Sequence, residues 1–275
     1  MGTSVERAAG TRIVRQLVWY FGGLLATYVA GLVIFWPPSG EQPNEAIFVV
    51  LMFAPTVGAV LAWLCAGARI QWGRPNLWLL AGLIPTLAVL GVYLLGSTLG
   101  WDVEDPSLLR AALTAAPVAI FSAALTAVGE EIGWRGFLWP LLRGRSGFWV
   151  ASLITMVIWW AYHVPLILLG WYGDAGHLPA FTVAIVGITL FIGVITDRSR
   201  SLWPSVVAHG AWNGLVATSF AVTEGDESIP AFAGSDELMG EFGWLAAVTI
   251  LVVGVVAALW HTRTMAAPIS SAKTG

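Results

Sequence analysis

Long apolar stretches alternate with short polar connections along almost the whole chain. A helix that crosses a bilayer needs about 20 mostly apolar residues. Eight stretches of the sequence reach that length. We therefore predict an all-α polytopic membrane protein, one helical bundle with about eight transmembrane helices, over residues 14–36, 46–68, 77–99, 107–142, 148–169, 178–196, 202–222 and 242–260.

The composition supports a membrane protein. Hydrophobic residues make up 57% of the chain and charged residues 11%, whereas soluble domains carry about 25% charged residues. We find no internal repeat. The predicted organisation is three N-terminal transmembrane helices (1–106), a central core (107–222), and an outside loop, last helix and tail (223–275), all within one structural domain.

Basic and acidic residues fall in alternating connections between the predicted helices. The basic residues fall before the first helix, in every second connection, and after the last helix: Arg7, Arg12, Arg15, Arg69, Arg74, Arg143, Arg145, Arg198, Arg200, Arg263 and Lys273. The other connections are acidic, and their only basic residue is Arg110, just inside the fourth predicted helix. The acidic residues are Glu41, Glu45, Asp102, Glu104, Asp105, Asp174, Glu224, Asp226, Glu227, Asp236, Glu237 and Glu241. Because Lys and Arg concentrate in cytosolic loops, we predict an integral plasma-membrane protein with both termini cytosolic. The small, polar tail after His261 should be disordered.

The fourth predicted helix is too long for one straight span. About 36 residues at about 1.5 Å each give about 54 Å, against a hydrocarbon core of about 30 Å. Pro117, Gly129, Gly133 and Gly136 offer places for a kink or a break. We expect a spanning part followed by a tilted or separate part that carries residues 130–135.

That second part concentrates formal charges in an otherwise apolar helix. Ionisable residues inside a bilayer are costly and tend to be paired and functional. Glu131 and Arg135 are four residues apart and can pair along one face. Glu130 lies on a neighbouring face, so we expect it to meet a group from another helix.

Few other strongly polar side chains stand within the predicted helices. Trp159 and His163 are four apart on one helix, and His209 and Asn213 are four apart on another. Three helices thus offer a carboxylate pair, a histidine, and a histidine with an amide. Straight, upright helices would leave these groups at different depths, so a shared site requires a tilt, a break or a re-entrant segment.

Two chemistries suit this set. In the first, Glu130 is a general base that activates water with help from His163, and His209 and Asn213 stabilise the oxyanion that forms on a peptide carbonyl. In the second, Glu130, His163 and His209 bind a Zn²⁺-like ion that leaves one position open for water. The spacing does not decide between a metal and no metal.

Structural readings compete with both chemistries. Glu131 and Arg135 can form a purely structural ion pair, and Glu130 can be a surface carboxylate at a helix end. A histidine or asparagine in a membrane helix often only joins two helices by a hydrogen bond. Buried carboxylates also suit a small-solute or proton transporter, although no paired broken helices or inverted repeats support that function.

In this order on separate helices, the motifs Glu130-Glu131-x-x-x-Arg135, Trp159-x-x-x-His163 and His209-x-x-x-Asn213 resemble the CPBP (CAAX protease and bacteriocin-processing) family. This is the family of type II CAAX prenyl endopeptidases, also called ABI proteins. The resemblance covers residues 107–222. It implies an intramembrane endopeptidase of the glutamate or metallo type.

In the family pattern, Glu130 and His163 would activate the water, and His209 and Asn213 would stabilise the oxyanion. Glu131 and Arg135 would shape the site. One departure is Trp159, where the family usually has Phe, and this bulkier ring bears on the size of the pocket. Family members linked to bacteriocin immunity or to membrane scaffolding provide a non-catalytic alternative. We expect a membrane protein or peptide as substrate, a lipid bilayer as surroundings, and no nucleic-acid partner.

Overall fold

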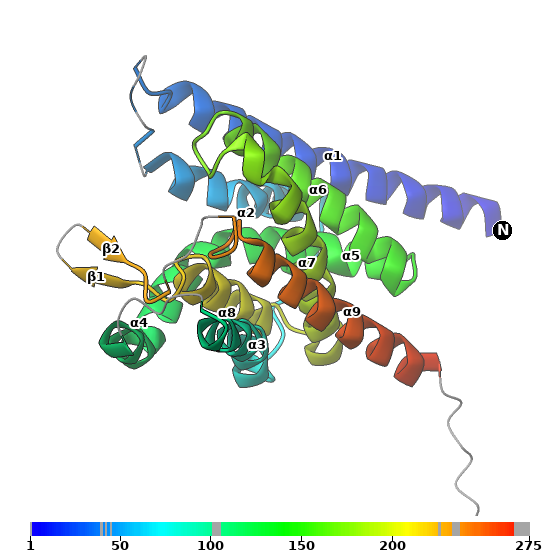
Figure 1. Ribbon diagram of the computed structural model, residues 1–275. Helices are drawn as coiled ribbons and strands as arrows, with labels where there is room; N and C mark the ends of the chain where they lie inside the picture. The colour runs from blue at the N-terminus through cyan, green and yellow to red at the C-terminus, as the bar shows by residue number, and fades with distance from the viewer. Residues whose placement is uncertain are drawn as a thin grey trace, which may run out of the picture.

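In a computed structural model the chain forms a bundle of helices with one small hairpin (Figure 1). The structure describes residues 2–38, 41, 43–44, 46–100, 106–224, 227–232 and 237–266. The helices are α1 (Gly2–Ile34), α2 (Ala46–Ala66), α3 (Trp78–Thr98), α4 (Pro106–Glu131), α5 (Trp139–Arg143), α6 (Phe148–Leu168), α7 (Leu178–Ser199), α8 (Trp203–Ala211) and α9 (Trp244–Ala266). Two π-helices, η1 (Ile132–Leu138) and η3 (Trp212–Val216), a 3₁₀ turn η2 (Ala175–His177), and the strands β1 (Val222–Glu224) and β2 (Glu227–Ile229) complete the described elements.

The all-α, polytopic prediction is confirmed. Seven helical segments in the described part of the chain are long and apolar enough to cross a membrane. The predicted span 202–222 differs, because its helical residues run only from α8 through η3, 203–216. At about 1.5 Å per residue this is about 21 Å, shorter than the hydrocarbon core. The chain then turns, and a hairpin follows at 222–229 that the hydropathy pattern did not predict.

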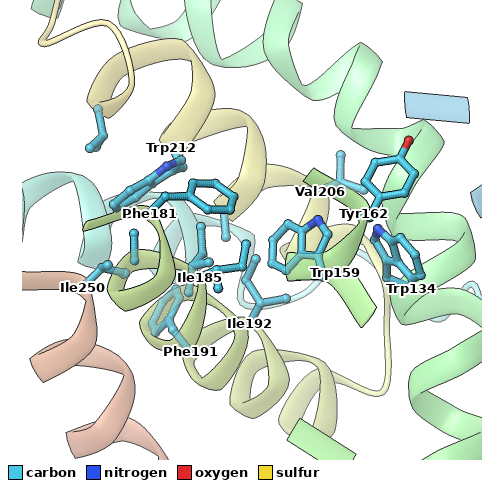
Figure 2. Close-up of a cluster of buried hydrophobic side chains, with 14 of the residues drawn as sticks. Trp134, Trp159, Tyr162, Phe181, Ile185, Phe191, Ile192, Val206, Trp212 and Ile250 are labelled. Carbon is cyan, nitrogen blue, oxygen red and sulfur yellow. The ribbon is translucent and has the colours of Figure 1, made fainter. Parts of the chain in front are cut away.

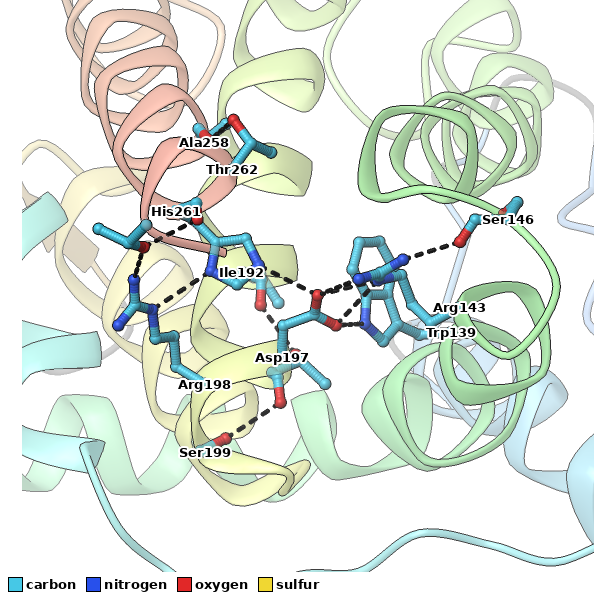
Figure 3. Close-up of polar contacts among 12 residues, drawn as sticks. Trp139, Arg143, Ser146, Ile192, Asp197, Arg198, Ser199, Ala258, His261 and Thr262 are labelled. Carbon is cyan, nitrogen blue, oxygen red and sulfur yellow. Dashed lines mark hydrogen bonds and ion pairs between the residues drawn. The ribbon is translucent and has the colours of Figure 1, made fainter. Parts of the chain in front are cut away.

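The predicted basic connections meet at one end of the bundle. Asp197 at the end of α7 pairs with Arg143 of α5 and lies 3.2 Å from the Nε2 atom of His261 in α9 (Figure 3). Near that end, Arg12 donates a hydrogen bond to the carbonyl oxygen of Gly67, which follows α2. The β1–β2 hairpin lies at the opposite end from the N-terminus of α1 (Figure 1). The helices therefore alternate in direction as the charge pattern predicted.

Some residues used to predict the acidic loops, and most of the predicted C-terminal tail, lie outside the described residues. Glu45, Asp102, Glu104, Asp105, Asp226 and Asp236 lie outside them. The predicted disordered tail begins as helix, because α9 continues to Ala266, and residues 267–275 again lie outside.

The long fourth helix changes its winding where the glycines predicted a break. The α-helical α4 passes into the π-helix η1 at Ile132 and resumes α-helical geometry at Trp139. A π segment shifts side chains around the axis and often occurs at functional sites. Gly133 has a second purpose, because a Cβ atom there would overlap Pro55 of α2. Within the charged stretch 130–135, Gly133 therefore lies directly against α2, with no room for a side chain.

Candidate active site

Two tryptophans hold the carboxylate of Glu130. Its Oε2 atom accepts hydrogen bonds from the indole Nε1 of Trp134 at 3.1 Å and of Trp159 at 2.8 Å. Trp134 follows one turn later in the same helix, whereas Trp159 comes from α6. Glu130 is only 2% exposed, and among the described residues its Oε1 atom has no hydrogen-bond partner. One oxygen is therefore fixed and the other is available.

Glu131 joins two basic groups beside Glu130. Its Oε1 atom lies 2.9 Å from Nη1 of Arg135 and 3.0 Å from Nδ1 of His209. The side chains of Glu131 and Arg135 are 0% exposed. The guanidinium carbon of Arg135 also lies 4.3 Å from the ring centroid of Trp159, a cation–π contact. The expected ion pair is present, and it also reaches α8.

The hydrogen bond of His163 fixes its tautomer. Its Nδ1 atom lies 2.8 Å from the carbonyl oxygen of Trp159. A carbonyl can only accept, so Nδ1 carries the proton and donates. The Nε2 atom of a neutral His163 then has a free lone pair. The same reasoning applies to His209, because its Nδ1 atom donates to the carboxylate of Glu131.

Trp159 lies at the centre of these groups. Its ring centroid is 6.1 Å from that of His163 and 5.4 Å from that of His209. Figure 2 shows Trp159 between Trp134 and Tyr162 on one side and Phe181 and Trp212 on the other. The larger ring at this position therefore supplies a hydrogen bond that Phe could not make, as well as filling space.

Small residues bring the third motif, His209-x-x-x-Asn213, close to α4. A Cβ atom on Gly210 would come within 2.9 Å of Ala124 in α4, and one on Gly214 within 2.7 Å of the carbonyl oxygen of Ala119. Small residues four apart let membrane helices approach closely. Because α8 and η3 lie against α4 in this way, His209 and Asn213 reach the depth of Glu130 without a full-length span.

All four candidate catalytic side chains line one cavity of about 320 Å³. They are Glu130, His163, His209 and Asn213. The remaining lining is mainly apolar and aromatic: Phe48, Leu51, Met52, Trp159, Tyr162, Leu166, Trp171, Tyr172, Phe181, Ala184, Ile185, Ile188 and Trp212. Apolar pockets with a few convergent polar groups are the usual form of small binding and catalytic sites.

One further carboxylate lines this cavity, and the sequence analysis had assigned it only to an acidic loop. Glu241 precedes α9 and accepts hydrogen bonds from the hydroxyl of Tyr172 and, at 3.3 Å, from Nε1 of Trp212. Burial raises the pKa of Glu241 above its usual value, while these hydrogen bonds and the nearby His163 lower it in part. Hydropathy gave no signal for this residue, because it lies outside the apolar segments.

The side chains as arranged do not fit a shared metal ion. Among the described residues, no three His, Cys, Asp or Glu side chains are grouped closely enough to hold one. Glu131 binds His209 and Arg135, and indoles occupy one oxygen of Glu130. We therefore derive no step through a metal for Glu130, His163 and His209.

The fold and the cavity define a polytopic membrane protein with a buried glutamate–histidine site. A family model described as "Type II CAAX prenyl endopeptidase Rce1-like" matches residues 112–215. This range contains all three motifs, and the family resemblance is confirmed for this part of the chain. A comparison with curated proteins finds no match.

Proposed function

We propose that the protein is an intramembrane endopeptidase that hydrolyses a peptide bond of a membrane-associated protein or peptide. The observation that carries this proposal is the single cavity lined by Glu130, His163, His209 and Asn213. The family match supports protease chemistry. The family's description also places CAAX-type prenylated peptides among the substrates to be tested first.

In the proposed reaction, Glu130 and His163 act on one water molecule. The free Oε1 atom of Glu130, or Nε2 of His163, takes a proton while the water oxygen bonds to the carbonyl carbon. Collapse of the resulting oxyanion breaks the C–N bond. The same proton passes to the leaving nitrogen, so that one carboxylate and one amine are formed. The indole hydrogen bonds keep Glu130 in place throughout.

His209 and Asn213 are the proposed donors to the oxyanion. His209 uses Nδ1 for Glu131, so it can donate from Nε2 only as an imidazolium. The carboxylate of Glu131 compensates that charge, and Arg135 in turn holds Glu131. The side-chain amide of Asn213 supplies the second donor. Preorganised donors of this kind are worth about 10²–10³ in rate each.

The basic end of the bundle should face the cytosol, as the positive-inside pattern predicts. The cavity reaches the opposite end, since Tyr172 and Glu241 lie in connections predicted outside. A C-terminal tag that a protease removes only after the cell is opened would support this orientation. Removal from intact cells would contradict it.

The proposed activity is tested by peptide hydrolysis in reconstituted vesicles. The panel contains transmembrane and prenylated peptides, and products are identified by mass. Glu130→Gln should lower kcat/KM by about 10²–10⁴, the usual contribution of a general base. Glu227→Gln is the matched control, because this glutamate is exposed in the hairpin. Cleavage by Glu130→Gln at the wild-type rate would refute the role of Glu130. Absence of cleavage by a folded wild type would favour the immunity or scaffold alternative.

A further inference from the structure

The cavity has a second acidic end that the proposed hydrolysis does not use. Glu241 lines the same cavity as Glu130 but comes from the connection before α9. Its two oxygens accept from the hydroxyl of Tyr172 and the indole of Trp212. These neutral donors fix the orientation of the carboxylate and do not neutralise its charge.

Aromatic side chains line the cavity together with this carboxylate. The ring centroid of Tyr172 is 6.2 Å from that of Phe181 and 5.6 Å from that of His163. Trp212 and Phe181 also line the cavity. Aromatic faces attract cations within about 6 Å of the ring centroid, and rings that surround a cation are a common recognition device. A carboxylate set among such rings favours a positively charged group.

The one cation proposed for this cavity, the imidazolium of His209, is paired with Glu131 rather than with Glu241. The lining of the cavity contains Glu130 and Glu241 and no Lys or Arg among the described residues. The two connections at this end, residues 169–177 and 237–243, contain Asp174, Glu237 and Glu241 and likewise no Lys or Arg. Fields of one sign at the mouth of a pocket attract groups of the opposite sign.

We infer that Glu241 is a specificity-determining residue that receives a positively charged group of the substrate peptide, a lysine or arginine side chain or a terminal amine. The inference rests on the proposed function for the peptide nature of the ligand. It separates this cavity from one built for a C-terminal carboxylate, which would meet Glu241 and Glu130 as like charges. The raised pKa of Glu241 agrees with this role, because an incoming cation restores the charge that burial disfavours.

Binding tests the inference without requiring cleavage. Three apolar peptides differ only in one residue, Lys, Gln or Glu, and their Kd values are measured on protein in lipid nanodiscs. Wild type should bind the Lys peptide about tenfold more tightly than the Gln peptide, and the Glu peptide least, as expected for a partly buried charge pair. In Glu241→Gln the amide oxygen can accept from the indole of Trp212 while the NH2 group donates to the hydroxyl of Tyr172, so this uncharged variant should bind all three about equally. Glu227→Gln, the exposed control, should keep the wild-type order.

Two outcomes would overturn the inference. Equal affinities for the three peptides in wild type would do so whether or not Glu241→Gln folds. So would a Lys preference that survives in a folded Glu241→Gln variant. A Lys preference without any cleavage would leave the subsite standing and refute the protease proposal.

Discussion

Two polar networks in this bundle use the same parts in different ways. At the basic end, Asp197 accepts from the indole of Trp139, the guanidinium of Arg143 and the imidazole of His261 (Figure 3). In the middle of the bundle, the neighbouring Glu130 and Glu131 accept from two indoles, one guanidinium and one imidazole. Each network thus combines tryptophan, arginine and histidine with a carboxylate.

The two networks differ in how completely their hydrogen bonds are formed. Both oxygens of Asp197 have donors, and its side chain is 13% exposed. In the central network, Oε2 of Glu131 and the Nε and Nη2 atoms of Arg135 are buried without a partner among the described residues. Native proteins leave few buried polar atoms unsatisfied, and such atoms often mark a bound water or a functional site. The complete network therefore joins helices, whereas the incomplete one contains two residues that line the cavity, Glu130 and His209.

The largest effect should come from removing one carboxylate from each network. Glu131→Ala removes the ion-pair partner of the buried Arg135, which costs about 3–5 kcal/mol of unfolding free energy. Asp197→Ala should cost about 1–3 kcal/mol, because Arg143 is 24% exposed and can turn to water. SDS-induced unfolding of the two variants measures the difference. Equal losses of unfolding free energy in the two variants would show that the deeper burial of the central network does not make it more important for stability.

A smaller effect should come from removing one indole donor from each network. Trp159→Phe deletes a hydrogen bond to Glu130, and Trp139→Phe deletes one to Asp197. A hydrogen bond to a charged group contributes about 1.5–3 kcal/mol, so Trp159→Phe should lower kcat/KM by about 10- to 150-fold. Trp139→Phe should lower thermal stability and leave kcat/KM within about twofold. The reverse pattern would place the functional carboxylate at the basic end.

The smallest effect is the pH dependence of the peptide preference, which tests Glu241 at its end of the cavity separately from Glu130. The raised pKa of Glu241 means that it loses its charge at a higher pH than an ordinary glutamate. The Lys-over-Gln preference in binding should therefore grow as pH rises through that pKa and fall below it, by about a fewfold. His163 and His209 also line the cavity, so Glu241→Gln, which carries no charge at this position at any pH, provides the reference. A preference with the same pH dependence in that variant would contradict the assignment.

The sequence predicted the parts of the fold that depend on hydropathy and charge. The long spans and their alternation follow from bilayer thickness and loop charge, and residues four apart predicted the Glu131–Arg135 pair. Helix 202–222 was predicted too long, because apolar residues after Val216 continue into a turn rather than a helix. Hydropathy does not distinguish these two forms when both are buried.

The sequence predicted which catalytic candidates form the site but not the hydrogen bonds between them. The bonds from Trp159 to Glu130 and from His209 to Glu131 depend on how helices distant in the sequence are rotated against α4, and the bond from Trp134 depends on the π-helix η1. Glu241 could not be found from spacing, because its partners Tyr172 and Trp212 are 69 and 29 residues away. A carboxylate in a short loop before a span looks the same whether it faces solvent or a cavity.

The most direct test of the central claim is a double-mutant cycle on Glu130 and His163. Values of kcat/KM are measured for wild type, Glu130→Gln, His163→Asn and the double variant on one peptide, with folding of each checked by unfolding. Residues that act on one water as a unit are strongly non-additive. We predict that the double variant is no more than about threefold slower than the slower single variant. Losses that multiply would show that the two residues act independently, and that the cavity does not hold one water between them.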